Sequence, residues 1–334
     1  MLHSMAYLKA DLARIGQSQE IKKIVLGNLQ FLFIFQALVS LSSTSGVKYF
    51  ESESKTWQPF SGFKPPSLQI KPAVLYSGNH LFLFDEKDVH QYQIDTNSWK
   101  TLPPMKNARH DFQACMLEDF LYVVGGCEVN HTAASERFSF SKKTWQLIGF
   151  HEEQGLYGCA QTVHNGYIYS VGGSWAAGGA DRGVFRFNPA KNEWTKLAGT
   201  THSHTQACAF VVKGKLYVAG GKTDPPSKRQ RGLVPSRHVE VYDEENDLWC
   251  SISQPHIPPN NYGAVEIEGR IYFMLGSFAY DSGIRIADDE VYHVDIEDWE
   301  PICHHNADAV FVYMPVNRAE ASDMKEVPVG VDSA

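Results

Sequence analysis

One pattern constrains this chain more than any other: six times, an aromatic residue precedes a tryptophan by seven positions. The pairs are Phe50/Trp57, Tyr92/Trp99, Phe138/Trp145, Phe187/Trp194, Tyr242/Trp249 and Tyr292/Trp299. Successive tryptophans are 42, 46, 49, 55 and 50 residues apart. A self-similar period of this length is typical of propellers and other repeat architectures, in which each repeat is one supersecondary unit. The chain is therefore expected to contain six copies of one unit.

A short apolar run with an aromatic residue near its centre lies upstream of these pairs. Clear copies span 121–124, 168–171, 216–219 and 271–274. Such runs are typical of strands with both faces buried. Three of them lead directly into a diglycine, where the missing Cβ atoms permit positive φ or a close approach of another backbone. These diglycines are at 125–126, 172–173 and 220–221.

A strand rich in small residues is expected before each apolar run. The turns at Asn165-Gly166, Lys213-Gly214 and Glu268-Gly269 are strong two-residue hairpin signals. Each unit then supplies four strands: a small-residue strand, an apolar strand, an aromatic strand and a tryptophan strand. Four-stranded sheets repeated radially form a β-propeller. An open solenoid of strands is the alternative, and it would need polar terminal caps.

The two ends of the chain suggest how such a ring closes. The first unit has no small-residue strand, and the segment 308–313 follows the last tryptophan without a unit of its own. We expect this C-terminal strand to complete the first sheet and remove an edge that would otherwise invite aggregation. The predicted domains are a short helical stub over 1–28, a six-bladed propeller over 29–315 and a disordered acidic tail over 316–334.

Together these features resemble kelch repeats. The diglycine, the aromatic–tryptophan spacing and the segment Leu102-Pro103-Pro104-Met105 with Arg109 are similar to the Kelch domain of the Kelch-like (BTB-BACK-Kelch) family, over about Leu29 to Pro315. The resemblance implies an all-β, six-bladed kelch-type β-propeller with four antiparallel strands per blade. It also implies a substrate-recognition module of a cullin-3 ubiquitin ligase.

The resemblance does not extend to the adaptor domains. That family uses BTB and BACK domains for dimerisation and cullin-3 binding, and this sequence does not contain them, so cullin-3 is expected as a partner only through domains absent here. Residues 1–28 are either a BACK-like remnant or an unrelated helix, with Leu8, Leu12 and Ile15 at helical spacing.

Charge and cysteine usage exclude several classes of function. Lys plus Arg total 30 against 38 Asp plus Glu, so no global positive field favours nucleic acid. The apolar stretch from Ile24 to Leu41 is interrupted by polar residues, so no membrane span is expected. The six cysteines include no CxxC pair, which favours a cytoplasmic protein with reduced thiols. The tract 228–231 is a weak nuclear-localisation signal, so a nuclear location is also possible.

The two faces of the predicted propeller differ in loop length. Connections from first to second and from third to fourth strand are uniformly short, whereas those from second to third strand vary. The insert between the diglycine position and the next aromatic ranges from 5 to 20 residues. Variable loops on a rigid scaffold are where binding residues usually lie. We therefore expect a protein partner on the long-loop face.

The fifth-unit loop on that face, from Lys222 to His238, is strongly basic. Its basic residues suit an acidic or phosphorylated segment of a partner, because guanidinium groups bind carboxylate and phosphate in bidentate fashion. A solvated, flexible loop is the alternative. Exposed Trp, Tyr and Arg dominate interface hot spots. The alternative for each candidate residue is that its side chain packs within its own loop. The candidate partner-binding residues are Arg109, His110, Tyr157, Trp175, Arg182, His202, His204, Lys228, Arg229, Arg231, Asn261, Tyr262, Phe278 and Tyr280.

Signals for an enzyme or a bound metal are weak. The segment 172–176 misses the GxSxG nucleophile elbow at its last position, and no HExxH, P-loop or GxGxxG occurs. Neither His202/His204 nor Cys303-His304-His305 comes with a paired ligand set at metal spacing. No cofactor, metal or catalytic residue is therefore predicted. A cytoskeletal scaffold of the actin-binding type and a carbohydrate-acting or copper-containing kelch enzyme are the alternatives to a substrate-recognition module.

Overall fold

The structure is a computed structural model in which the described residues form strands, turns and short loops. It describes residues 34–42, 46–51, 56–59, 65–66, 73–94, 96–128, 131–132, 134–149, 156–175, 178–227, 232–252, 261–267, 270–275, 289–295, 298–305 and 309–317. All regular secondary structure in these ranges is β, which confirms the predicted class. Among these residues, no helix has the length and apolar character that crossing a membrane requires.

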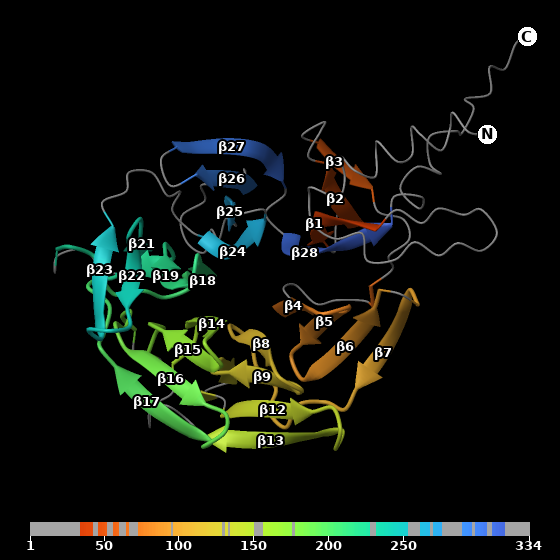
Figure 1. Cartoon of the computed structure of the whole chain (residues 1–334), viewed down its shortest axis with the longest axis horizontal. Coiled ribbons are helices and arrows are strands. Elements are labelled where there is room, and N and C mark those ends of the chain that lie inside the picture. Colours follow the sequence, from red (N-terminus) through yellow and green to blue (C-terminus); the bar gives the residue numbers. More distant parts are fainter. Residues whose placement is uncertain are drawn as a thin grey trace, which may run out of the picture.

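The described strands form six four-stranded antiparallel sheets, arranged around a common centre in Figure 1. The first three sheets are β28(Ala309–Asn317)-β1(Ile34–Ser42)-β2(Gly46–Glu51)-β3(Thr56–Pro59), β4(Ala73–Ser77)-β5(His80–Asp85)-β6(Asp88–Gln93)-β7(Ser98–Leu102), and β8(Gln113–Leu117)-β9(Phe120–Val124)-β12(Ser135–Ser139)-β13(Thr144–Gly149). The other three are β14(Ala160–His164)-β15(Tyr167–Val171)-β16(Val184–Asn188)-β17(Glu193–Leu197), β18(Cys208–Val212)-β19(Lys215–Ala219)-β22(Val239–Asp243)-β23(Leu248–Ile252), and β24(Asn261–Ile267)-β25(Arg270–Leu275)-β26(Asp289–Asp295)-β27(Asp298–His305). Two short ladders, β10(Cys127–Glu128) with β11(His131–Thr132) and β20(Lys222–Thr223) with β21(Val234–Pro235), lie in connecting loops.

The aromatic–tryptophan spacing arises from the turn between the third and fourth strands. In five sheets the two residues are directly opposite each other across the ladder, as Phe187 and Trp194 are. The rings of that pair lie 5.0 Å apart, within contact range for aromatic pairs. In the sixth sheet Trp299 faces Val294 instead, because Asp295 pairs with Asp298 across a tighter turn and a register shift follows at Val291/Tyr292.

Turn chemistry reinforces this register. The last turn residue before the fourth strand has positive φ in four sheets, at Asn97, Lys143, Asn192 and Asp247. In two of them the aromatic residue is a tyrosine whose hydroxyl donates to that residue: Tyr92 to Asn97 Oδ1 and Tyr242 to Asp247 Oδ1, both at 2.7 Å. Asn and Asp tolerate the left-handed region better than most residues. The predicted hairpins Asn165-Gly166 and Lys213-Gly214 also have positive φ at both positions, as type I′ turns require.

The hydrophobic core lies in the seams between neighbouring sheets. The apolar residues of the second strands β5, β9 and β15 are buried on both faces, as predicted; in β9, residues from Leu121 to Val124 have at most 1% exposure. Three of the core clusters draw on two sheets each, and in one of them Trp145 packs with Phe84 and Leu102 of the preceding sheet. The indole N–H of Trp145 also donates to Pro103 O at 2.7 Å. Trp145 therefore connects its sheet to the preceding one.

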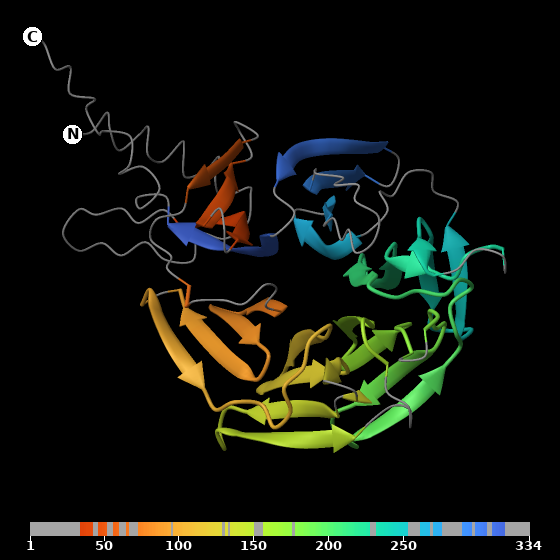
Figure 2. The same cartoon turned by 180° about the vertical axis from the view of Figure 1, so that it is seen from behind.

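The first strands surround the centre, and the first and last described strands, β1 and β28, share a sheet. The strands β28, β4, β8, β14, β18 and β24 are neighbours in that order. Strand β28 pairs with β1 in register from Ser42↔Ala309 to Ile34↔Asn317, and Figures 1 and 2 show the two side by side. The helix predicted over 1–28 and the tail beyond Asn317 lie outside the described residues.

Candidate functional site on the long-loop face

The connections between strands differ strongly between the two ends of the sheets. At one end, first and second strands are joined by two residues, such as Asn165 and Gly166. At the other end, β9 connects to β12 through 125–134, β15 to β16 through 172–183 and β19 to β22 through 220–238. The segments linking successive sheets also lie at this second end. We call this side the long-loop face, and its contrast with the opposite side is the one predicted from loop lengths.

Three inter-repeat segments, 109–111, 156–158 and 204–206, are linked in series on this face. The N–H of Gly158 donates to Asp111 O at 2.9 Å, and the N–H of Gln206 donates to Gly158 O at 2.7 Å. All three of these residues have positive φ. Equivalent residues of successive repeats are therefore joined by backbone hydrogen bonds, which gives the face a rigid inner rim.

The diglycines permit this close packing. Gly173 donates its N–H to His204 O at 2.7 Å, which joins the loop of one sheet to the following inter-repeat segment. A Cβ at the adjacent Gly172 would lie 2.1 Å from His204 O, closer than any side chain can come. A Cβ at Gly221 would lie 2.3 Å from Thr205 O. The predicted reasons for the diglycine, positive φ and close backbone approach, therefore apply together here.

The structure corrects the assignment of Arg109 as a surface partner-binding residue. Its side chain is fully buried and forms an ion pair with Glu136, which is also fully buried. Arg109 donates further hydrogen bonds to Gly125 O and Ala134 O, and Glu136 accepts from two backbone N–H groups. A buried charge needs such a set of partners, so the interior of the repeat accounts for this arginine.

His204 is corrected for the same reason. It has 0% exposure, its Nδ1 lies 3.2 Å from Gly220 O and its Nε2 lies 3.2 Å from Glu240 Oε1. Glu240 also accepts the N–H groups of Thr201 at 2.6 Å and His202 at 2.9 Å. Burial alone would raise the pKa of Glu240, but the hydrogen bonds from His204, Thr201 and His202 lower it to about 2. This carboxylate fixes the segment that precedes β18.

The predicted residue His202 is partly exposed and stacks on a second histidine. Its ring lies 3.4 Å from that of His238, with 9° between the planes. Burial, followed by the nearby His202 and His204, lowers the pKa of His238. Two stacked imidazoles cannot both be charged without repulsion, so the neutral form of His238 is favoured.

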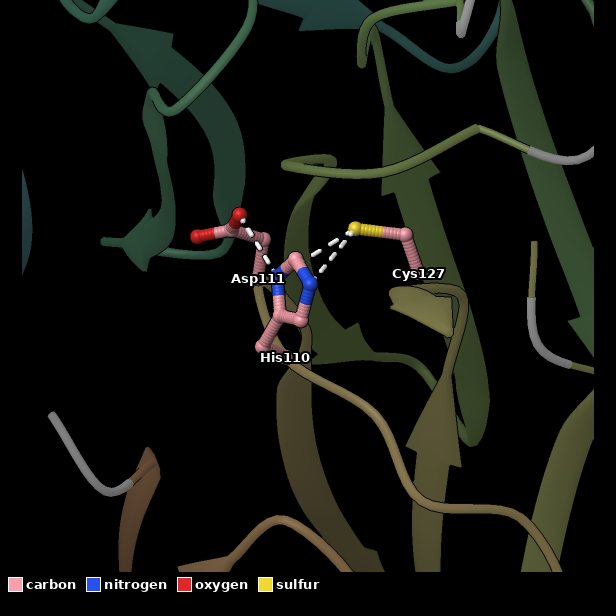
Figure 3. Close-up of side chains that lie close together, drawn as sticks. All are labelled: His110, Asp111 and Cys127. Atoms are coloured by element: carbon pink, nitrogen blue, oxygen red, sulfur yellow. Dashed lines mark hydrogen bonds and ion pairs between the residues drawn. The ribbon is translucent and has the colours of Figure 1, made fainter. Parts of the chain in front are cut away.

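The predicted residue His110 lies in a three-residue cluster with Asp111 and Cys127. His110 Nδ1 is 3.0 Å from Asp111 Oδ2 and 3.3 Å from Cys127 Sγ (Figure 3). The His110 and Asp111 side chains are 64% and 44% exposed. Burial, and then the charge of Asp111, raises the pKa of the Cys127 thiol to about 11. This thiol is therefore protonated at neutral pH, unlike the low-pKa thiolates of nucleophilic cysteines.

The other predicted residues are placed differently. Arg182 is exposed, Tyr157 is half-buried, and half-buried Trp175 packs against the cluster of Leu156, Cys159 and Phe185. Asn261 and Tyr262 begin β24, and their side chains lie outside the described residues. The candidates Lys228, Arg229, Arg231, Phe278 and Tyr280 also lie outside them. Of the predicted set, the structure thus brings His110, Tyr157, Trp175, Arg182 and His202 to the described part of the long-loop face.

Three residues that organise this face were absent from the sequence predictions. Glu136 and Glu240 each stand nine positions before the tryptophan of their sheet, a shared repeat position that alignment of the units reveals. Cys127 directly follows a diglycine, and that position pairs with an inter-repeat segment in three sheets: His110↔Cys127, Tyr157↔Ser174 and Thr205↔Lys222. The repeat register, rather than local residue type, is the signal that could have identified them.

Comparison with known proteins finds kelch motifs in this chain and similarity to Kelch-like proteins. The family model of the Kelch motif matches residues 155–200 and 204–256. Kelch-like protein 23 of Homo sapiens is 27% identical over 213 residues, covering 63% of this chain and 35% of the relative. Kelch repeat and BTB domain-containing protein 1 of camelpox virus is 29% identical over 169 residues, covering 49% and 28%. Residues 155–200 and 204–256 therefore carry kelch motifs, and the chain resembles the Kelch-like proteins over a larger part of its length.

Two further matches extend the comparison along the chain. Kelch-like protein 41a of Danio rerio is 25% identical over 259 residues, covering 73% of this chain and 42% of the relative. The chain thus spans between about a quarter and two fifths of the length of these relatives. The solved structure of YjhT superposes with a TM-score of 0.59 at 14% identity, over 72% of this chain and 85% of that one. This likeness supports the fold of repeated four-stranded sheets.

Proposed function

We propose that this chain is a six-bladed kelch propeller that binds a protein partner through its long-loop face. The observation that carries the proposal is the rigid inner rim formed by the inter-repeat segments 109–111, 156–158 and 204–206. Backbone hydrogen bonds connect this rim from repeat to repeat, while exposed side chains such as His110 and Arg182 project from the same face. Variable loops held on a rigid scaffold are the usual arrangement of a binding surface.

The six sheets act as blades in this proposal. Strand β28 completes the sheet of β1, β2 and β3, so the last part of the chain fastens the first blade. This pairing covers the edge of β1, so the first blade has no open edge on that side. The supporting observations are the continuous order of first strands from β28 to β24 and the β1–β28 register.

The partner we propose is a protein segment with carboxylate or phosphate groups. Arg182 is exposed on the long-loop face and Arg237 is exposed in the basic fifth-unit loop. The predicted binding residues Lys228, Arg229 and Arg231 belong to the same loop in sequence. Arginine binds both anionic groups through two parallel hydrogen bonds. Thr200 connects Arg182 to His202, because its N–H donates to Arg182 O at 2.9 Å and its hydroxyl donates to His202 O at 2.6 Å, and His202 would add a further polar contact.

We further propose that this recognition serves a cullin-3 ubiquitin ligase in the cytoplasm. The support is the similarity to proteins named Kelch-like and Kelch repeat and BTB domain-containing. In this proposal the kelch domain selects the client and does not catalyse a reaction. Contact with cullin-3 would require BTB and BACK domains supplied outside this sequence.

A comparison of matched variants on the two faces tests the proposal. The tagged full chain, its Arg182→Glu variant and its Lys191→Glu variant are used to capture proteins from cell extract, followed by quantitative mass spectrometry. Arg182 precedes β16 on the long-loop face, whereas Lys191 lies in the turn after β16 at the opposite end, and both are exposed. We expect Arg182→Glu to lose a partner at least about tenfold, because a charge repelling the partner replaces a charge-assisted pair.

The Lys191→Glu variant is expected to capture that partner as well as the unchanged chain does. Addition of an acidic peptide from the captured protein should compete with it. Equal capture by both variants, or loss confined to Lys191→Glu, would place binding elsewhere and refute the proposal.

A further inference from the structure

We propose that His110, Asp111 and Cys127 form a binding site for a divalent zinc-class metal on the long-loop face. The three residues supply one imidazole nitrogen, one carboxylate oxygen and one sulfur, and these atoms lie within 4.8 Å of one another. Figure 3 shows the imidazole of His110 between the carboxylate and the thiol. The inference does not depend on the partner proposed above.

The separations of these atoms suit a tetrahedral metal. His110 Nδ1 is 3.0 Å from Asp111 Oδ2 and 3.3 Å from Cys127 Sγ, and His110 Nε2 is 3.4 Å from the same sulfur. Zinc bonds of about 2.0–2.3 Å at tetrahedral angles place ligand atoms roughly 3.5 Å apart. A metal could therefore be bound with small side-chain rotations.

The backbone already fixes the residues that would bind the metal. The N–H of His110 donates to Cys127 O at 3.1 Å, and the N–H of Cys127 donates to His110 O at 2.9 Å. Asp111 has a φ of 53°, and its carbonyl oxygen accepts the N–H of Gly158 at 2.9 Å. Two rigid segments thus bring the ligands together before any metal arrives, which reduces the entropy lost on binding.

The kelch repeat does not by itself require this cluster. The equivalent backbone pairs of the next two sheets are Tyr157 with Ser174 and Thr205 with Lys222. Neither pair includes a cysteine or a histidine, although the backbone pairing is the same. The candidate metal ligands therefore occur in only one of these three equivalent pairs, so the backbone pairing of the repeat does not explain them.

The ligand types select the class of metal. A sulfur, an imidazole and a carboxylate suit borderline ions such as zinc, whereas calcium and magnesium prefer oxygen ligands alone. Binding would replace the S–H bond of Cys127 by a sulfur–metal bond and release the proton to solvent. Because the His110 side chain is 64% exposed, a fourth position remains accessible to water or to a ligand atom from another molecule.

Cobalt(II) titration of the metal-free full chain tests this site, because cobalt replaces zinc in tetrahedral sites and gives a thiolate-to-cobalt absorption band. The test variants are Asp111→Asn and Cys127→Ser; asparagine tolerates the positive φ at 111 and removes the charge. Each should weaken cobalt affinity by roughly 100-fold or more, since even the loss of an outer-shell partner costs about 10- to 100-fold.

Two cysteine variants serve as controls. Cys250→Ser removes an exposed thiol, and Cys303→Ser removes the thiol of the Cys303-His304-His305 sequence. Both should retain the full affinity, the absorption band and competition by zinc, and all variants should keep the circular dichroism spectrum of the unchanged chain. The proposal is overturned if the unchanged chain gives no thiolate band, or if Cys127→Ser binds cobalt as tightly as the unchanged chain.

Discussion

Two buried repeat positions change together from sheet to sheet. Arg109, Leu156 and His204 stand sixteen residues before the first glycine of their diglycines, and their partners are Glu136, Phe185 and Glu240. The outer two pairs are polar, whereas Leu156 and Phe185 pack in one apolar cluster. Where one of the two positions carries a buried charged or ionisable side chain, the other carries its partner. This follows because a lone buried charge would have a large desolvation cost.

This covariation predicts the outcome of a double-mutant cycle. Arg109→Leu leaves Glu136 buried without its cation and should lower the unfolding free energy by about 3–5 kcal/mol. The double variant Arg109→Leu/Glu136→Phe, which copies the pair Leu156/Phe185, should lose less stability than Arg109→Leu alone. Urea denaturation of the four proteins measures the coupling between the two positions. Additive losses would contradict the inference that the two positions act as one unit.

At the scale of elements, a carboxylate connects a third strand to the segment before the next first strand. Glu240 on β22 accepts hydrogen bonds from Thr201 and His202, which precede β18. Glu136 on β12 has the same role toward Lys106 and Asn107 before β8. These contacts hold the inter-repeat segments in the positions from which their exposed residues project.

The low pKa of Glu240 makes this connection dependent on pH. Its folded-state pKa of about 2 lies below the ordinary value of 4.5, so its contribution to stability is fully present above about pH 4.5 and is lost as pH falls toward 2. Glu240→Gln should lower stability by about 1–3 kcal/mol at pH 7 through weaker hydrogen bonds. It should also flatten the decline between pH 4.5 and 2.

Urea denaturation at a series of pH values measures both effects. Glu245→Gln, which changes an exposed carboxylate in the turn after the same strand, is the matched control and should retain the decline. If Glu240→Gln and Glu245→Gln had the same pH profile as the unchanged chain, the role assigned to Glu240 would be wrong.

Strand order and seam packing could be predicted from the sequence because they depend on local periodicity. The step from Phe187 to Trp194 reflects a turn of constant length, and the diglycines mark a fixed backbone geometry. The same logic failed at Trp299, where a tighter turn changes the register without changing the spacing. The pairing of a strand was thus predictable where it depends on a turn of constant length, and it was not predictable where the turn differs.

The site was less predictable, because surface exposure depends on partners distant in the sequence. Arginine is a residue type common at binding surfaces. Arg109, however, is held in the interior by its ion pair with Glu136, 27 positions later. Cys127 was not predicted because its proximity to His110 follows from pairing across a loop. Aligning the repeats with one another would have revealed both relationships, since each recurs at fixed repeat positions.

At the scale of the whole molecule, the first and last described strands meet in one sheet. Strand β28 lies against β1 along its whole length, and β28 also neighbours β4 of the following sheet. In the closed ring that we propose, every seam between sheets depends on the presence of both neighbours. The rigid long-loop face that we propose as the binding surface therefore relies on the β1–β28 pairing.

Thermal unfolding of two truncated chains tests this account most directly. A chain ending at Asn317 retains β28, whereas one ending at Asn306 lacks it and exposes the β1 edge. We predict that the first melts within about 2 °C of the full chain. The second should melt at least about 5 °C lower and aggregate, because losing the strand and its seam should remove about 3 kcal/mol or more, at about 2 °C per kcal/mol for a domain of this size, and an unpaired edge recruits other chains. Identical melting of all three chains would contradict the closed ring.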